Sequence, residues 1–161
     1  SISDTTIRNS QIEDALHLVR SEARIDRLDI NNPQSDCIDA DFSVVTIANS
    51  SISKCKGDGL DVSGSLLNAS KVKIFENGDK NISVGENSRA YITHSLLADS
   101  AFGIASKEGS RVYLAGALIR GNHRGISIYS KKPFFAASEV NADGSVLLEK
   151  NSVQISREPV Y

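Results

Sequence analysis

The four residues Gly59-Leu60-Asp61-Val62 decide the fold, because variants of this quartet return every 22 residues along the chain. The second position is always aliphatic, and the first is small or polar. Apolar residues alternate in pairs such as Leu60 and Val62, which is the pattern of a strand rather than a helix. The other copies are Ala15-Leu16-His17-Leu18, Cys37-Ile38-Asp39-Ala40, Asn81-Ile82-Ser83-Val84, Gly103-Ile104-Ala105-Ser106 and Gly125-Ile126-Ser127-Ile128.

Two further columns of apolar residues follow the same step. A fixed period of this length indicates a solenoid, and the leucine pattern of leucine-rich repeats is missing. We therefore predict an all-β parallel solenoid with 22-residue coils, in which each coil holds three short strands joined by polar corners. The two columns, both predicted to pack inside with His94, are Ile30, Ile52, Ile74, Leu96, Leu118, Val140 and Ile25, Ile47, Ala69, Tyr91, Tyr113, Phe135. The alternative for Tyr91, Tyr113 and Phe135 is a stacked face that binds sugars.

The repeat covers nearly the whole chain. Six clear copies, with weaker ones around Ile7 and around residues 146–155, predict about seven coils stacked ~4.8 Å apart. The irregular segment Lys131–Ser138 is expected to form a loop. Residues 1–161 are expected to be one domain, and the absence of Met, even at position 1, suggests a piece of a longer precursor.

Composition excludes several classes of function. The formal charge is −2, which gives no argument for a nucleic-acid partner. No segment approaches the roughly 20 apolar residues of a membrane span, so no membrane insertion is expected. Cys37 and Cys55 lack the spacing of a metal cluster. We expect two free, half-buried thiols, with a single disulfide as the alternative.

The quartets Gly59-Leu60-Asp61-Val62, Gly103-Ile104-Ala105-Ser106 and Gly125-Ile126-Ser127-Ile128 resemble the strand repeats of right-handed parallel β-helix proteins, the pectin-lyase-like superfamily. The resemblance implies a right-handed helix. The runs Ile104–Lys107 and Tyr129–Pro133 are similar to β-helix modules that lie beside CotH-type kinase domains in bacterial surface proteins. Enzymes of the superfamily cleave or epimerise acidic polysaccharides.

An acidic column is the most suggestive candidate site. The third quartet position points outward, so His17, Asp39 and Asp61 should lie on adjacent coils. Two carboxylates at such a distance could serve as the acid and base of glycoside cleavage. The alternatives are a Ca²⁺ site, since carboxylate clusters suit that ion, and a solvated ridge of corner residues. The predicted metal ligands are Asp36, Asp39, Asp41, Asp58 and Asp61.

A second candidate surface surrounds the predicted loop. Solenoid insertions often carry the binding face, and basic side chains there would suit an acidic glycan. The candidate ligand-binding residues are Lys107, Arg124, Tyr129, Lys131 and Lys132.

Two functions remain open at this stage. The first is a non-catalytic module of a bacterial extracellular or cell-surface protein, which acts as a spacer between neighbouring domains and as a possible polysaccharide-binding surface. Short corners and few coils favour it. The alternative is a polysaccharide lyase, hydrolase or epimerase that uses Asp39, Asp61 and His17. No cofactor is expected, unless Ca²⁺ binds the acidic column.

Overall fold

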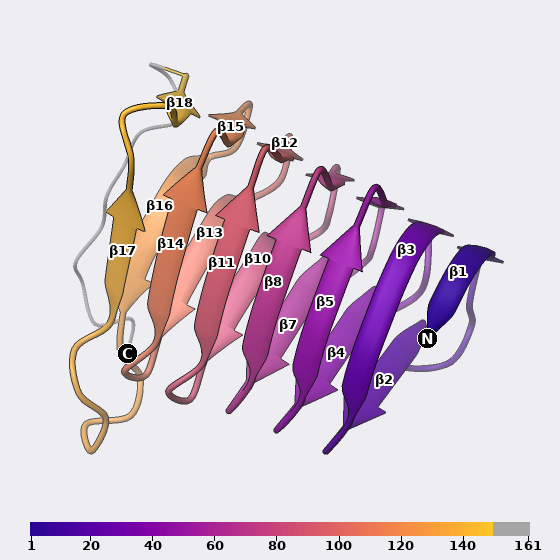
Figure 1. Cartoon of the computed structure of the whole chain (residues 1–161), viewed down its shortest axis with the longest axis horizontal. Helices are drawn as coiled ribbons and strands as arrows, with labels where there is room; N and C mark the ends of the chain where they lie inside the picture. Colours follow the sequence, from indigo (N-terminus) through magenta and orange to yellow (C-terminus); the bar gives the residue numbers. More distant parts are fainter. Residues whose placement is uncertain (150–161) are drawn as a thin grey trace.

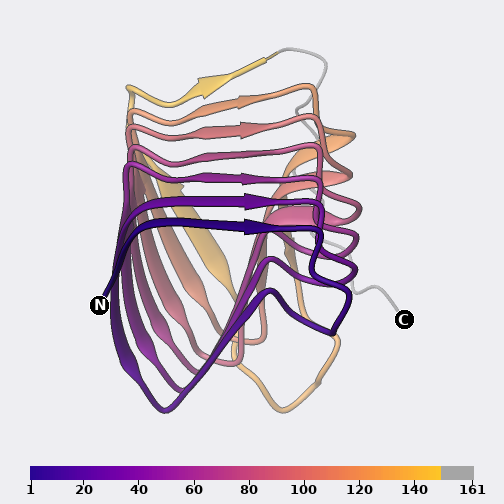
Figure 2. The same cartoon turned by 90° about the vertical axis from the view of Figure 1, so that its right-hand side faces the viewer.

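The computed structural model of the protein describes residues 1–149 and is a stack of parallel strands (Figure 1). Every strand pair in it is parallel, and each coil contributes strands to three faces, as the sequence predicts. Figure 2 shows the successive coils lying one behind another. Residues 146–149 fall within this description, whereas the rest of the predicted last coil, up to residue 155, lies outside it.

The first face carries the quartets and marks six coils. Its register confirms the period, since Leu16, Ile38, Leu60, Ile82, Ile104 and Ile126 are consecutive partners. Its strands are β2 (Leu16–Val19), β4 (Ile38–Asp41), β7 (Leu60–Ser63), β10 (Lys80–Gly85), β13 (Phe102–Lys107) and β16 (Arg124–Tyr129).

The other two faces are continuous with each other, because the long strand β3 (Glu22–Asn31) passes round their common corner and β1 (Ile2–Arg8) pairs with it. The second face begins with the first half of β3 and continues with β5 (Val44–Ala48), β8 (Leu66–Ser70), β11 (Arg89–Thr93), β14 (Arg111–Ala115) and β17 (Glu139–Ala142). The third face begins with the second half of β3 and continues with β6 (Ser51–Ser53), β9 (Lys73–Phe75), β12 (Leu96–Ala98), β15 (Leu118–Arg120) and β18 (Leu147–Leu148).

Aliphatic side chains from all three faces fill the interior. Ile38, Leu60, Ile82 and Ile104 of the first face are fully buried. Each coil covers the apolar groups of its neighbours, so stability is a sum over adjacent coils. The predicted loop is present between β16 and β17, and it extends beyond the corners of the neighbouring coils (Figures 1 and 2).

The second face departs from the strict 22-residue step. Leu66 pairs with Arg89, which is 23 residues further on, because the corner before β11 holds one extra residue. Glu86 and Asn87 both adopt left-handed backbone angles there, whereas Gly64 alone does so in the preceding coil. The corner before β13 is one residue shorter, so the first face regains its period.

This shift overturns several predictions of buried residues. Tyr91 and Tyr113 point outward, and their places in the interior are taken by Ile92 and Leu114. His94 is exposed at a corner instead of being buried. The two predicted columns are also wrong beyond Ala69 and Ile74: Leu97, Ile119 and Leu148 replace Leu96, Leu118 and Val140, while Phe135 lies in the loop.

A ladder of corner serines records the true register. At each corner after the first face, a serine backbone N–H donates to the hydroxyl of the equivalent serine in the next coil. The serines are Ser21, Ser43, Ser65, Ser88 and Ser110, and the donor–acceptor distances run from 2.8 to 3.2 Å. Their spacing contains the same 23-residue step, since Ser65 pairs with Ser88.

The two cysteines form a disulfide, so the expectation of free thiols was wrong. Cys37 and Cys55 point into the interior from adjacent coils, with a Cα–Cα distance of 5.5 Å. The separation of 18 residues is slightly less than one 22-residue coil, so the two sulfurs lie beside each other on either side of one corner.

Candidate functional site

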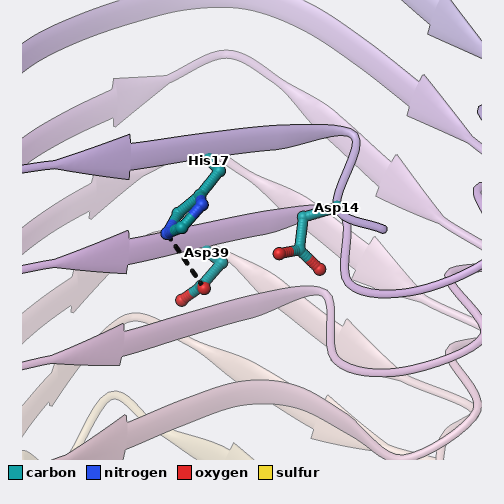
Figure 3. Close-up of side chains that lie close together, drawn as sticks. All are labelled: Asp14, His17 and Asp39. Atoms are coloured by element: carbon teal, nitrogen blue, oxygen red, sulfur yellow. Dashed lines mark ion pairs between the residues drawn. The ribbon is translucent and has the colours of Figure 1, made fainter. Parts of the chain in front are cut away.

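The acidic column forms on the outer surface of the first face, as predicted. His17, Asp39 and Asp61 are consecutive partners on β2, β4 and β7. The His17 Nε2 atom lies 3.4 Å from Asp39 Oδ2 and 3.4 Å from Asp41 Oδ2. Figure 3 shows His17 and Asp39 facing each other, with Asp14 beside them. The outward alternation of short strands therefore brings one imidazole and several carboxylates together.

The environment of Asp39 favours its protonated form. Partial burial raises the pKa of Asp39 to about 6, with further contributions from the negative charges of Asp41 and Asp61. A carboxyl group with such a pKa can give or take a proton near neutral pH. Asp39 is therefore the residue of the column best suited to transfer a proton.

Asp36 and Asp58 belong instead to a ladder that supports the backbone. The Asp58 N–H donates to Asp36 Oδ1 at 2.6 Å, and the Lys80 N–H donates to Asp58 Oδ1 at 2.8 Å. Asp14 begins the ladder by accepting the Asp36 N–H at 3.3 Å. These three carboxylates each satisfy a backbone donor of the next coil, which is a structural task.

Lys80 closes the ladder and compensates its charge. The Lys80 ammonium lies 3.3 Å from Asp58 Oδ1 and also contacts the Asp79 carboxylate. Burial alone would lower the pKa of Lys80, but the charges of Asp58 and Asp79 raise it above its usual value. Lys80 therefore remains a cation, and it offers no neutral amine for proton abstraction.

Two groups of side chains have the proximity that metal binding requires. One ligand atom from each residue of a group lies within 4.8 Å of the others, and the groups are Asp14, His17, Asp39 and Asp36, Asp58, Asp61. The buried Asp61 Oδ1 atom has no hydrogen-bond partner. Carboxylate oxygens such as these could hold Ca²⁺, and Ca²⁺ binding stays a prediction.

Asp14 and Lys80 were not among the predicted site residues. Asp14 could have been found, because it precedes Asp36 by the same 22 residues that separate Asp36 from Asp58. Lys80 occupies the next position of that column, so the change from acid to base marks the point at which the charge is compensated.

The residues of the predicted basic surface do not form one cluster, because they contact different side chains. Tyr129 is 8% exposed, and the Lys131 ammonium lies 5.8 Å from the centre of its ring. Lys132 forms an ion pair with Glu86, which raises the pKa of Lys132. Arg124 lies over the ring of Phe102, at the opposite end of the strand from Tyr129, and Lys107 pairs with Tyr129 in the sheet register.

Comparison with known proteins gives one finding. A family model described as the right-handed beta helix region matches residues 1–156. No curated protein and no solved structure matches the chain. Within residues 1–149, none of the elements is a helix of the length and apolar character that a membrane crossing demands.

Proposed function

Because the chain belongs to the right-handed β-helix family, we propose that it is a non-catalytic module of an extracellular or cell-surface protein. In this role it spaces neighbouring domains and presents a polysaccharide-binding surface. A rigid solenoid suits both tasks, since it holds side chains at fixed intervals along an extended surface.

The shortness of the corners is the observation that carries this proposal. Two or three residues separate each first-face strand of the first five coils from the following second-face strand. Such corners raise no wall on their side of the acidic column, whereas catalysis generally uses a concave site that excludes water. Among the described connections that leave the first face, only the loop between Tyr129 and Glu139, in the sixth coil, is longer. The connections that enter the first face before β2, β4 and β7 hold seven, six and six residues.

The disulfide supports the proposed location. Disulfides persist in oxidising environments and are rare in the cytosol of most organisms. Cys37 and Cys55 are 0% and 1% exposed, which shields this bond from reducing thiols.

An enzyme acting on acidic polysaccharides is the second candidate, and the properties of Asp39 favour it. Its raised pKa and its register with Asp61 place a carboxyl group that can exchange a proton near neutral pH beside a second carboxyl group. A hydrolase of this kind needs such a pair.

One experiment separates the two candidates. The protein is incubated with a panel of neutral and acidic polysaccharides, and retention in polysaccharide-containing gels is measured together with the release of reducing or unsaturated ends. A module retains at least one polysaccharide and releases no new ends. Release that disappears in Asp39→Asn would replace the proposal with the enzyme, and the absence of any retention would remove the binding role. Repeating the assay with Ca²⁺ and with a chelator tests the predicted ion.

A further inference from the structure

The outer surface of the second face carries a pair of stacked tyrosines. Tyr91 and Tyr113 are partners on β11 and β14, with ring centroids 4.9 Å apart and planes 8° apart. Tyr91 is 41% exposed. The stack adds stability between coils, yet Tyr113 is only half-buried and Tyr91 lines two separate hollows.

The first hollow offers an aromatic wall and a polar rim. It has a volume of about 400 Å³, and both tyrosines line it together with the small side chains of Ala115 and Ala142. Asp143 lies at its edge, and hydrogen bonds from Ser145 lower the pKa of that carboxyl group. The ionised carboxylate is an acceptor suited to sugar hydroxyl groups.

The second hollow combines polar and apolar surface with one positive charge. It has a volume of about 440 Å³, and Arg89 is the one charged residue among those that line it. No carboxylate of residues 1–149 forms an ion pair with Arg89. Phe42, which is 59% exposed, forms another part of the lining, and the Arg20 guanidinium lies 5.9 Å from the centre of its ring.

We propose that these two hollows together form a binding site for an acidic glycan that crosses the strands of the second face. Tyr91 contacts two successive parts of the glycan. A sugar ring has an apolar face of C–H groups that fits an aromatic wall, and its hydroxyl groups need polar partners at the rim. A ligand carboxylate in the second hollow pairs with the unpaired Arg89 guanidinium. This inference rests on the proposed function and assigns it to one surface.

The assigned surface differs from the acidic column and from the basic surface near the loop, and it uses Tyr91 and Tyr113 of the aromatic column that the sequence suggests as an alternative sugar-binding face. The acidic column on the first face gathers several carboxylates, which repel a negatively charged glycan more strongly than the single Asp143 carboxylate of the second face does. The basic side chains near the loop are partly engaged, as the Lys132 ion pair with Glu86 illustrates. The second face combines a cation without an ion pair among residues 1–149, the exposed ring of Tyr91 and hollows of suitable size.

The test uses a hexamer of galacturonic acid and its methyl ester as probes, with affinity measured by calorimetry. Arg89→Ala should weaken binding of the acid about tenfold, as expected for loss of a charge-assisted contact, and should leave binding of the ester unchanged. Tyr91→Ala should weaken both probes, whereas Tyr91→Phe keeps the ring and should retain affinity. Arg24→Ala and Phe134→Ala are the matched controls and should bind like the wild type.

The outcomes separate this inference from the proposed function. Wild-type binding that Arg89→Ala and Tyr91→Ala leave intact overturns the assignment to the second face, while the binding role survives. Loss of binding in a Lys131→Ala, Lys132→Ala double variant alone also overturns it. If the wild type binds neither these probes nor any polysaccharide of the panel, both proposals fail. Arg89 is exposed and outside the core, so its variant remains informative even if Tyr91→Ala does not fold.

Discussion

Two halves of the solenoid hold the same interior corner together by different chemistry. In the N-terminal half, the disulfide between Cys37 and Cys55 links adjacent coils. In the C-terminal half, the positions equivalent to the two cysteines hold polar residues that form hydrogen bonds with one another. Asn77 Nδ2 donates to Asn81 Oδ1 at 2.9 Å, and Asn81 Nδ2 donates to Asn122 Oδ1 at 3.0 Å.

The asparagine network and the disulfide differ in the interactions that each needs to be stable in the interior. A buried amide is stable only when its donors and acceptors are satisfied. Asn122 meets this requirement fully, since Nδ2 donates to the Leu97 and Arg120 carbonyls while Oδ1 accepts from the Ser100 N–H and from Asn81. The disulfide needs no hydrogen bonds, and it acts largely by restricting the unfolded chain. Substitution of an interior asparagine in the C-terminal half should therefore lower stability more than removal of the disulfide in the N-terminal half.

Breaking the amide network should have the largest effect. Asn122→Ala leaves the Ser100 N–H and two carbonyl oxygens without this partner in the interior, and we expect a loss of about 3–4 kcal/mol in the free energy of unfolding. Urea denaturation measures it. Asn141→Ala, which removes an exposed amide, should change stability little. A loss below about 1 kcal/mol for Asn122→Ala would show that water replaces the network.

Removing the disulfide should lower the free energy of unfolding slightly less than Asn122→Ala does. The bond closes a loop with a sequence separation of 18, and the chain-entropy model gives about 3 kcal/mol for a loop of this size. The double variant Cys37→Ala, Cys55→Ala should lower the midpoint of urea denaturation accordingly and leave the folded circular dichroism spectrum unchanged. An unchanged midpoint would mean that packing alone holds the N-terminal coils.

Gly59 lies where the two halves meet, between Cys37 and Asn81 in the same column. A Cβ atom at Gly59 would lie 2.5 Å from Ile74 Cγ2 and 2.9 Å from Asn77 Nδ2. Gly59→Ala should therefore destabilise the protein by about 2 kcal/mol through overpacking. Gly144→Ala is the control, since nothing lies within 4 Å of a Cβ atom there. Equal midpoints for the two variants would show that the junction relaxes freely.

The smallest effect concerns the third quartet position, where the N-terminal coils carry the half-buried Asp39 and Asp61 while the next coils carry the fully buried Ser83 and Ala105. The pKa of Asp39 in the folded protein is raised from 3.8 to about 6, so protonation of Asp39 favours the folded state. That stabilisation is complete below pH 3.8 and is lost as the pH rises through 6.

Replacing Asp39 should remove this dependence. Asp39→Asn should be more stable than the wild type at neutral pH by about 1 kcal/mol, and the advantage should vanish in acid. Thermal unfolding across this pH range measures it, with Glu13→Gln as an exposed control. A constant difference between Asp39→Asn and the wild type at all pH values would contradict the assigned pKa.

The first face was predictable because each of its strands keeps the same step. The aliphatic partners Ile38, Leu60 and Ile82 directly gave the register and the acidic column beside it. The second and third faces did not keep that step. The corner before β11 has one added residue and the corner before β13 has one residue fewer, so the strands between these corners are shifted by one position. Adjacent apolar residues such as Leu96 and Leu97 concealed the shift in the sequence, whereas the strand register and the serine ladder both show it.

The interior partners and the charge compensation depend on contacts that spacing alone does not specify. Cys37 and Cys55 are not separated by a multiple of 22, so no column analysis brings them together. Lys80 belongs to the aspartate column by position, but its ion pair with Asp58 depends on the direction of a long side chain.

Thiol labelling tests the register most directly, and the placement of the tyrosine surface depends on that register. The wild-type protein has no free thiol, so a single introduced cysteine reports its own position. Tyr91 is 41% exposed and Ile92 is 0% exposed. Tyr91→Cys should therefore react rapidly with a water-soluble thiol reagent in the folded state, while Ile92→Cys reacts only on unfolding. The reverse order would restore the strict 22-residue step and place the tyrosines inside.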